Sequence, residues 1–88
     1  MASDIFRNPA SLADVALTAL SSHEWRVSNR RVDPSDPAGL IGFIEQTGGE
    51  YEVLRLGAPL ERSHYPSLAD ARAAFVDAAH VTMVSRAA

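Results

Sequence analysis

The sequence predicts an α+β domain with the order α-β-β-β-α, in which helices pack on a three-stranded antiparallel meander. Three observations lead to this class. The tetrapeptide Ser-Leu-Ala-Asp occurs at 11–14 and again at 67–70, and each copy precedes an apolar stripe with helical spacing. Between the copies, the apolar segments 40–46 and 51–56 flank a Gly-Gly pair. The chain has 88 residues, so we expect one small globular domain over 1–88.

Two N-cap signals define the predicted helices. Ser11 can accept a hydrogen bond from an unpaired backbone N–H, and Asp14 follows three residues later, as in a capping box. The next apolar residues recur at helical spacing: Leu12, Val15, Ala16, Ala19 and Leu20. We therefore expect a helix over about residues 11–21, and the same pattern from Ser67 predicts a second helix over about residues 67–82.

Three strands are expected between these helices, over about residues 24–30, 40–46 and 51–56. In the first of them, Trp25 and Val27 alternate with polar residues, which is typical of a half-buried strand. The intervening segment 33–39 is expected to be a loop, because its prolines and its glycine interrupt regular structure.

The Gly48–Gly49 pair predicts a tight hairpin, because glycine adopts the positive φ angles that two-residue turns need. Such a turn fixes the register of the two strands that it joins. The residues expected to lie directly opposite each other are Ile44 and Val53, Phe43 and Leu54, and Glu45 and Glu52. The last pair brings two negative charges together, which leaves a different register open.

Strand pleating divides the side chains of this sheet between two faces. We expect the core face to be covered by the C-terminal helix and to carry Ile41, Phe43, Leu54 and Leu56, together with Trp25 and Val27. The opposite face carries Gly42, Ile44, Gln46, Tyr51, Val53 and Arg55, with Arg26, Ser28 and Arg30 from the first strand. Either the N-terminal helix covers this second face, or the face stays partly open and binds a partner.

Six residues of the second face form the predicted contact site: Arg26, Arg30, Ile44, Tyr51, Val53 and Arg55. Apolar residues with polar residues around them are typical of protein interfaces. The leading hypothesis is therefore a non-catalytic interaction or scaffolding domain that binds a protein partner or forms a homodimer. The alternative is a nucleic-acid-binding module, in which the arginines contact phosphate and Tyr51 stacks on a base.

The predicted order of elements resembles that of double-stranded-RNA-binding domains, in topology alone. In that family the last helix begins with clustered lysines that contact phosphate. Here the corresponding helix begins Ser67-Leu68-Ala69-Asp70-Ala71-Arg72, with an acidic first turn and a single arginine. No residue role is carried over from the family to this sequence.

No set of residues matches a catalytic, nucleotide-binding or metal-binding motif. The three histidines, His23, His64 and His80, do not have the spacing of metal ligands, and the chain has no cysteine. We therefore expect no metal, no cofactor and no enzymatic activity. The net charge of −3 gives no general attraction to nucleic acid or to anionic membranes.

Three further expectations concern the compartment and the C-terminal part of the chain. No apolar run approaches the roughly 20 residues needed to span a bilayer, and the first residues lack the pattern of a signal peptide, so we expect a soluble, cytoplasmic protein without membrane contact.

The apolar segment 81–85 is expected either to fray or to dock on a second copy. Arg72 falls within the apolar stripe of the second helix, and its guanidinium is expected to reach Glu61 or another acidic residue.

Overall fold

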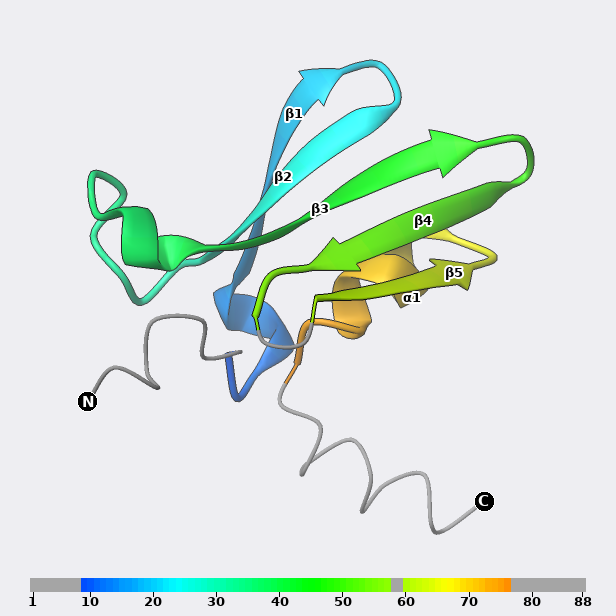
Figure 1. Ribbon diagram of the computed structural model, residues 1–88. Coiled ribbons are helices and arrows are strands. Elements are labelled where there is room, and N and C mark those ends of the chain that lie inside the picture. The colour runs from blue at the N-terminus through cyan, green and yellow to red at the C-terminus, as the bar shows by residue number, and fades with distance from the viewer. Residues whose placement is uncertain (1–8, 58–59, 77–88) are drawn as a thin grey trace, which may run out of the picture.

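The computed structural model describes residues 9–57 and 60–76. Its strands form one five-stranded antiparallel sheet, in which each strand lies beside its neighbours in sequence (Figure 1). The strands are β1 (Val15–Ser21), β2 (Glu24–Asn29), β3 (Leu40–Thr47), β4 (Glu50–Arg55) and β5 (Glu61–Tyr65). The helical elements are the 3₁₀ helices η2 (Leu12–Asp14) and η3 (Pro37–Gly39) and the α-helix α1 (Leu68–Ala73).

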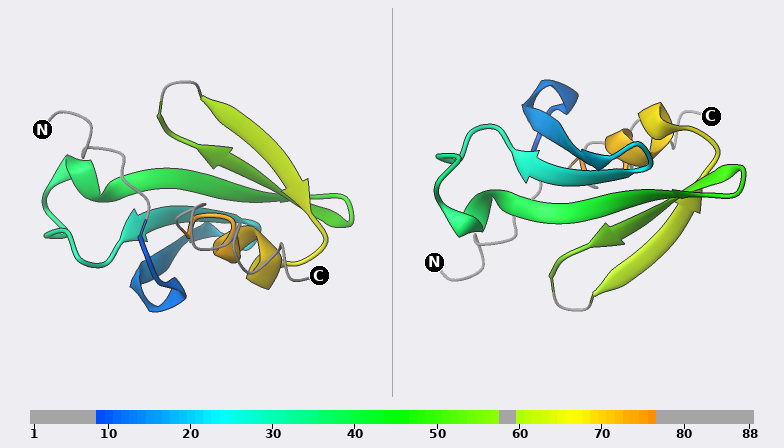
Figure 2. Two further views of the ribbon diagram at one scale, coloured as in Figure 1. Left: turned by 90° about the horizontal axis from the view of Figure 1, so that it is seen from below. Right: turned by 90° about the horizontal axis from the view of Figure 1, so that it is seen from above.

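Helix α1 lies against one face of the sheet, and the sheet curves around it (Figure 2). Because of this curvature, α1 contacts the edge strand β1 as well as β4 and the other edge strand, β5. We call the face toward α1 the inner face and the face turned away from it the outer face. Within the described ranges, no α-helix lies on the outer face.

The predicted α-β-β-β-α order is wrong, because the segment after Asp14 is the strand β1 and not a helix. Val15 and Thr18 are β-branched, and pairing with β2 satisfies the backbone groups along one side of β1. A further strand that the sequence did not indicate, β5, pairs with β4. Over residues 9–57 and 60–76 the result is a five-stranded, mostly β structure with one short α-helix, and not a three-stranded sheet with helices packed on it.

The second predicted helix begins where the N-cap signal places it. The Ser67 hydroxyl accepts a hydrogen bond from the Asp70 N–H at 3.0 Å, and α1 follows directly. The last part of the predicted helix, 77–82, and the apolar segment 81–85 lie outside the described residues.

β3 pairs with β4 in the predicted register, including Glu45 opposite Glu52. Val27 and Ile41 lie in the core as predicted. The assignment of most of the hairpin residues to the two faces, however, is wrong. Ile44 and Val53, which were predicted to point away from the core, are only 1% and 0% exposed and belong to it. Phe43, predicted to be in the core, lies on the outer face and is only half-buried.

Gly42 explains which face α1 covers. Phe75, two residues after α1, is 0% exposed, and its ring lies where a Cβ on Gly42 would be. A strand residue without a side chain leaves room for an aromatic ring close to the backbone of β3. The outer face carries Phe43 and Leu54 on the neighbouring pair of positions and offers no comparable space.

The core is a cluster of buried side chains: Val15, Val27, Ile41, Ile44, Val53, Ala71 and Phe75. Ile41 joins it because the pairing of β2 and β3 is irregular at this point. Gly42 lies opposite Val27, but Leu40 and not Ile41 lies opposite Ser28, so a β-bulge turns Ile41 inward. Full burial of a larger side chain of this kind contributes about 1.5–3 kcal/mol.

Arg72 joins α1 to the beginning of β1. Its Nε and Nη2 donate to the Val15 carbonyl at 3.2 and 3.1 Å, and Nη2 also donates to the Leu12 carbonyl at 3.1 Å. The expected acidic partner, such as Glu61, is therefore replaced by two backbone carbonyls. Since β1 is an edge strand, these bonds satisfy acceptors that no neighbouring strand reaches.

Candidate functional site

Two of the six predicted contact residues lie in the core. Ile44 and Val53 are opposite each other on the inner face, beneath α1 and Phe75. From the sequence, either an N-terminal helix covers them or the face stays partly open. The covering element is the C-terminal helix, and neither side chain is accessible to a partner.

Two more of the predicted contact residues also point to the inner face. Tyr51 is half-buried, and its ring lies 6.0 Å from that of Trp25, measured between centroids. The Arg55 guanidinium lies 3.7 Å from the carboxylate of Glu61, which stands opposite it on β5. Both side chains therefore have partners within the domain.

The remaining two predicted residues, Arg26 and Arg30, are exposed. Arg30 follows β2, and its Nε donates to the Ala13 carbonyl at 3.1 Å. Arg26 projects from the outer face, where it lies opposite Phe43. Because Arg55 belongs to the inner face, the three arginines do not form one strip.

The outer face carries two apolar side chains at its centre. Phe43 and Leu54 lie directly opposite each other on β3 and β4, and both are half-buried. In the same row across the sheet, Arg26 flanks Phe43 on β2, and Arg62 flanks Leu54 on β5. We call Phe43 and Leu54 the apolar centre and the whole row the arginine row.

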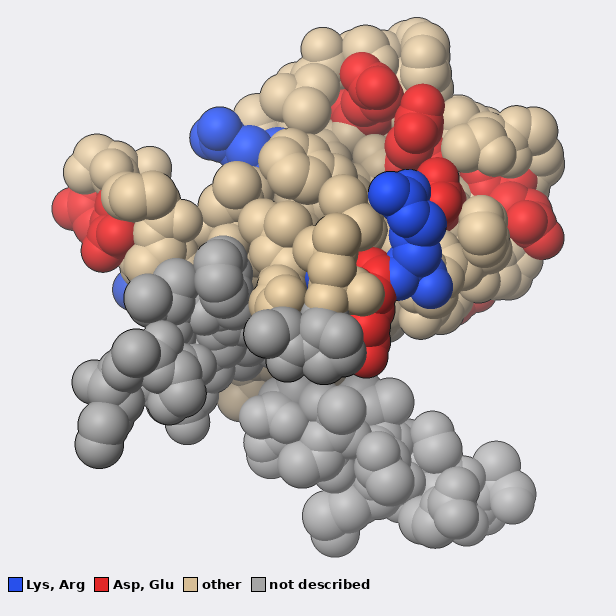
Figure 3. Space-filling model, viewed as in Figure 1, with Lys and Arg blue, Asp and Glu red and all other residues tan. Residues whose placement is uncertain are grey.

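Next to the arginine row, acidic side chains cross the sheet in a parallel row. Register places Glu24 opposite Glu45, Glu45 opposite Glu52, and Glu52 opposite His64. We call Glu24, Glu45 and Glu52 the glutamate row, and Figure 3 shows acidic side chains gathered on this side of the molecule, with a basic side chain beside them.

Glu52 explains how the sheet tolerates the pairing of Glu45 with Glu52. The Arg62 Nη1 donates to Glu52 Oε2 at 3.1 Å, and His64 Nε2 lies 3.8 Å from the same oxygen. The positive charge of Arg62 reduces the repulsion between the two glutamates. The strand that supplies this arginine was absent from the predicted fold.

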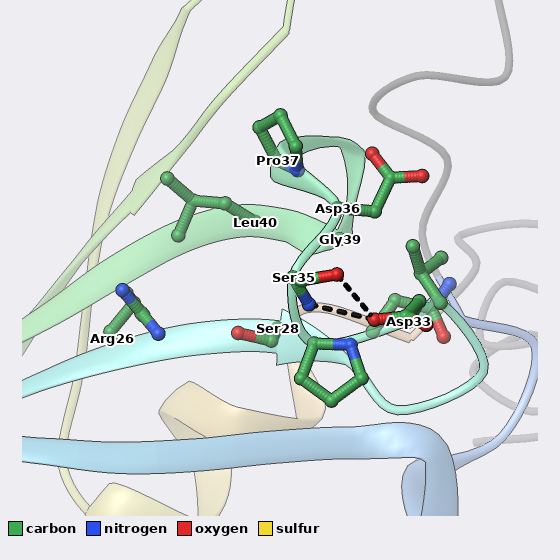
Figure 4. Close-up of a pocket in the computed structure, with 11 residues that line it drawn as sticks. Arg26, Ser28, Asp33, Ser35, Asp36, Pro37, Gly39 and Leu40 are labelled. Atoms are coloured by element: carbon green, nitrogen blue, oxygen red, sulfur yellow. Dashed lines mark hydrogen bonds between the residues drawn. The ribbon is translucent and has the colours of Figure 1, made fainter.

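A cavity of about 240 Å³, which we call the loop cavity, lies where the β2–β3 loop meets the outer face. Figure 4 shows Arg26, Ser28 and Leu40 on the sheet side of this cavity, with Ser35 and Pro37 on the loop side. Residues 33–39 were predicted only to be a loop. Its Asp-Pro-Ser-Asp-Pro pattern was a signal for the turns that shape the cavity, but not for the sheet residues beneath them.

Hydrogen bonds within the loop fix its two aspartates. Asp33 Oδ1 accepts from the Ser35 N–H at 2.9 Å and from its hydroxyl at 2.7 Å. These two bonds, the first more strongly, hold the pKa of Asp33 below its usual value, so this exposed carboxylate is ionised at neutral pH. Asp36 Oδ1 accepts from the Ala38 N–H at 2.9 Å and caps η3.

No family model, no curated protein and no solved structure matches the chain. Within residues 9–57 and 60–76, no three histidine, aspartate or glutamate side chains are close enough to hold a metal ion. None of the helices in those ranges has the length and hydrophobicity to cross a membrane. The outer face and the loop cavity are therefore the candidate sites that the geometry offers.

Proposed function

We propose that this chain is a non-catalytic interaction domain that forms a homodimer through the outer face of its sheet. The observation that carries the proposal is the apolar centre, Phe43 and Leu54, which α1 leaves uncovered. Arginines flank it within its own row, and the glutamate row lies beside it. Apolar surface with a polar rim is typical of protein interfaces. We place this function in the cytoplasm, because the chain has no cysteine for the disulfides that small secreted domains use.

A second copy is the favoured partner because the charges of the outer face complement each other. The glutamate row and the arginine row are parallel and adjacent. A two-fold axis that runs across the strands between the rows places Arg26 of each copy over Glu24 of the other. The same operation places Phe43 and Leu54 of each copy over Glu45 and Glu52 of the other, so the two apolar centres are offset by two residues along the strands and contact each other only at their edges.

The same charges argue against the nucleic-acid alternative. Three glutamates in one row on the exposed face repel phosphate, and the chain as a whole is acidic. The arginines proposed for phosphate contact are divided between the two faces, since Arg55 pairs with Glu61 on the inner one. A protein surface with complementary charges therefore fits the outer face better than a nucleic acid does.

Sedimentation equilibrium of the full chain tests this proposal. We expect a reversible monomer–dimer equilibrium in the micromolar range that weakens with added salt. Phe43→Thr replaces one residue that favours strands with another and removes apolar surface twice per dimer. We expect it to raise the dissociation constant at least about tenfold, since each copy loses about 1–2 kcal/mol of apolar burial.

Two controls make the result specific to this face. Leu12→Thr changes a leucine that is 44% exposed but lies in η2, off the sheet, and we expect it to leave the dissociation constant unchanged. Arg26→Glu and Glu24→Arg should each weaken the homodimer, and mixing the two variants should restore association. A chain that stays monomeric at every concentration, or a Leu12 variant that weakens as much as Phe43→Thr, contradicts the proposal.

A further inference from the structure

The floor of the loop cavity presents two hydrogen-bond donors from one strand. Arg26 and Ser28 are two residues apart on β2, so both side chains project from the outer face. The guanidinium of Arg26 makes no ion pair with a carboxylate of the described residues. The half-buried hydroxyl of Ser28 likewise has no hydrogen-bond partner among those residues, so no other side chain of the described ranges competes with a ligand for these two donors.

The loop side of the cavity is held in place without these donors. Asp33 is bonded by Ser35, and Asp36 is bonded by the Ala38 N–H. Figure 4 shows the Asp36 carboxylate pointing away from Arg26 and Leu40. The shape of the cavity is therefore set by the loop itself, and a ligand does not have to break an internal bond to enter it.

Apolar side chains form the remaining wall. Leu40 is half-buried on the sheet side, and Pro37 and Val32 contribute carbon surface from the loop. The volume of about 240 Å³ is below the roughly 300–1,000 Å³ of sites for drug-sized ligands, so it suits a ligand of few atoms.

We propose that this cavity binds a small aliphatic monocarboxylate. The carboxylate accepts two hydrogen bonds from the Arg26 guanidinium, which matches its geometry, and a third from the Ser28 hydroxyl. The alkyl group packs against Leu40 and Pro37. The negative charges of Asp33 and Asp36 disfavour a dianion such as phosphate at the same place. Both the charge and the size of the ligand are thereby defined.

An NMR titration of the ¹⁵N-labelled full chain with sodium isovalerate tests the proposal. It is repeated with the Phe43→Thr variant at the same concentration, because Arg26 also belongs to the proposed dimer interface and the comparison separates ligand binding from dissociation of the dimer. We expect saturable shifts at the amides of the β2–β3 loop and of β2, with a dissociation constant of about 1–10 mM. Isovaleramide, which has the same shape without the charge, and inorganic phosphate should not produce these shifts.

Three variants assign the binding to the named side chains. Arg26→Gln should weaken isovalerate binding at least about tenfold, the cost of a charged hydrogen-bonded pair. Arg62→Gln removes the other arginine of the same row and should have no effect. Asp36→Asn keeps an N-cap acceptor but removes a negative charge, and it should strengthen binding about twofold at low salt.

Several outcomes would overturn the assignment. Equal shifts with the amide would show that the carboxylate is not recognised. Equal weakening by Arg62→Gln would show general attraction to a basic surface. Shifts that never saturate, or that spread over the whole spectrum, would show that no defined site exists.

Discussion

The two Ser-Leu-Ala-Asp segments have the same four residues and begin different structures. In both, the serine hydroxyl accepts a backbone hydrogen bond: Ser11 from the Ala13 N–H at 3.1 Å, and Ser67 from the Asp70 N–H at 3.0 Å. The first segment makes one 3₁₀ turn, η2, and the chain then extends into β1. The second continues into α1. An N-cap motif therefore indicates where a helical turn starts, and not how far it continues.

The residues that follow each segment account for the difference. After the first come Val15 and Thr18, whose branched side chains favour a strand, and a hairpin partner is available in β2. After the second come Ala71, Ala73 and Ala74, and alanine has the highest helix propensity. Phe75 then anchors this end of the chain in the core. Local preference and tertiary contacts agree in each case.

The two segments also contact each other. Arg72, in the helical copy, donates to the carbonyls of Leu12 and Val15, at the end of the other copy. Helix α1 thus depends both on its own core contacts and on the strand that the first segment introduces. Substitutions at each of these contacts separate the contributions.

The largest effect is expected from Phe75→Ala, which removes the side chain that anchors α1. Phe75 is completely buried against Gly42, so we expect a loss of about 3–5 kcal/mol in the free energy of unfolding. Urea denaturation followed by circular dichroism measures it. Val76→Ala changes the adjacent, half-buried residue and should cost clearly less. If Phe75→Ala costs less than about 1 kcal/mol, Phe75 does not hold α1 on the inner face.

Gly42 gives the complementary test of the same contact. A Cβ at this position overlaps both the Phe75 ring and the Leu54 backbone carbonyl oxygen, so Gly42→Ala should also destabilise the fold, by about 1–3 kcal/mol or more. Gly49→Ala is the matched control, because nothing lies within 4 Å of a Cβ at that turn position. Similar losses for the two variants would contradict close packing of Phe75 on β3.

These contacts also show what the sequence could and could not predict. The hairpin register followed from Gly48–Gly49, because a two-residue turn allows few pairings. The choice of inner face did not follow from periodicity, because both faces of β3 and β4 carry large apolar residues. Gly42 within a strand was the available signal, since it marks a close approach of another group.

The candidate sites were predicted only in part, for the same reason. Arg26 was identified as an exposed contact residue, whereas Ile44 and Val53 were assigned to the face that α1 in fact covers. Arg62 was not considered, because β5 was not predicted. Its polar sequence, Glu-Arg-Ser-His-Tyr, lacks the apolar alternation of a half-buried strand. Edge strands of this kind are recognised by pairing, which depends on the rest of the sheet.

A smaller effect is expected from Arg72→Met, which keeps an unbranched apolar stem and removes the donors. The Val15 carbonyl at the beginning of β1 loses the Arg72 donors, and the Leu12 carbonyl in η2 keeps only the Val15 N–H, so we expect a loss of about 1–3 kcal/mol. Arg31→Met is the control. The Arg31 side chain is 76% exposed, and its Nη1 makes one long ion pair, at 3.7 Å, with Asp14 Oδ2. Exposed ion pairs contribute little, so this control should stay within about 0.5 kcal/mol of the parent. Equal losses would mean that Arg72 acts through charge and not through its carbonyl bonds.

The smallest effect comes from the caps themselves, and it sharpens the comparison between the segments. Ser67→Ala removes the cap of α1 and should cost about 1 kcal/mol, the usual value for an N-cap serine. Ser11→Ala removes the hydrogen bond from the Ala13 N–H in a single 3₁₀ turn whose next residue is already extended, so we expect only a few tenths of a kcal/mol. The free energy of unfolding of each variant is measured under identical conditions, and the difference between the Ser67→Ala and Ser11→Ala values tests the comparison. If Ser11→Ala costs as much as Ser67→Ala, the first cap also stabilises the start of β1, and the two identical segments differ less in their energetic role than in their structure.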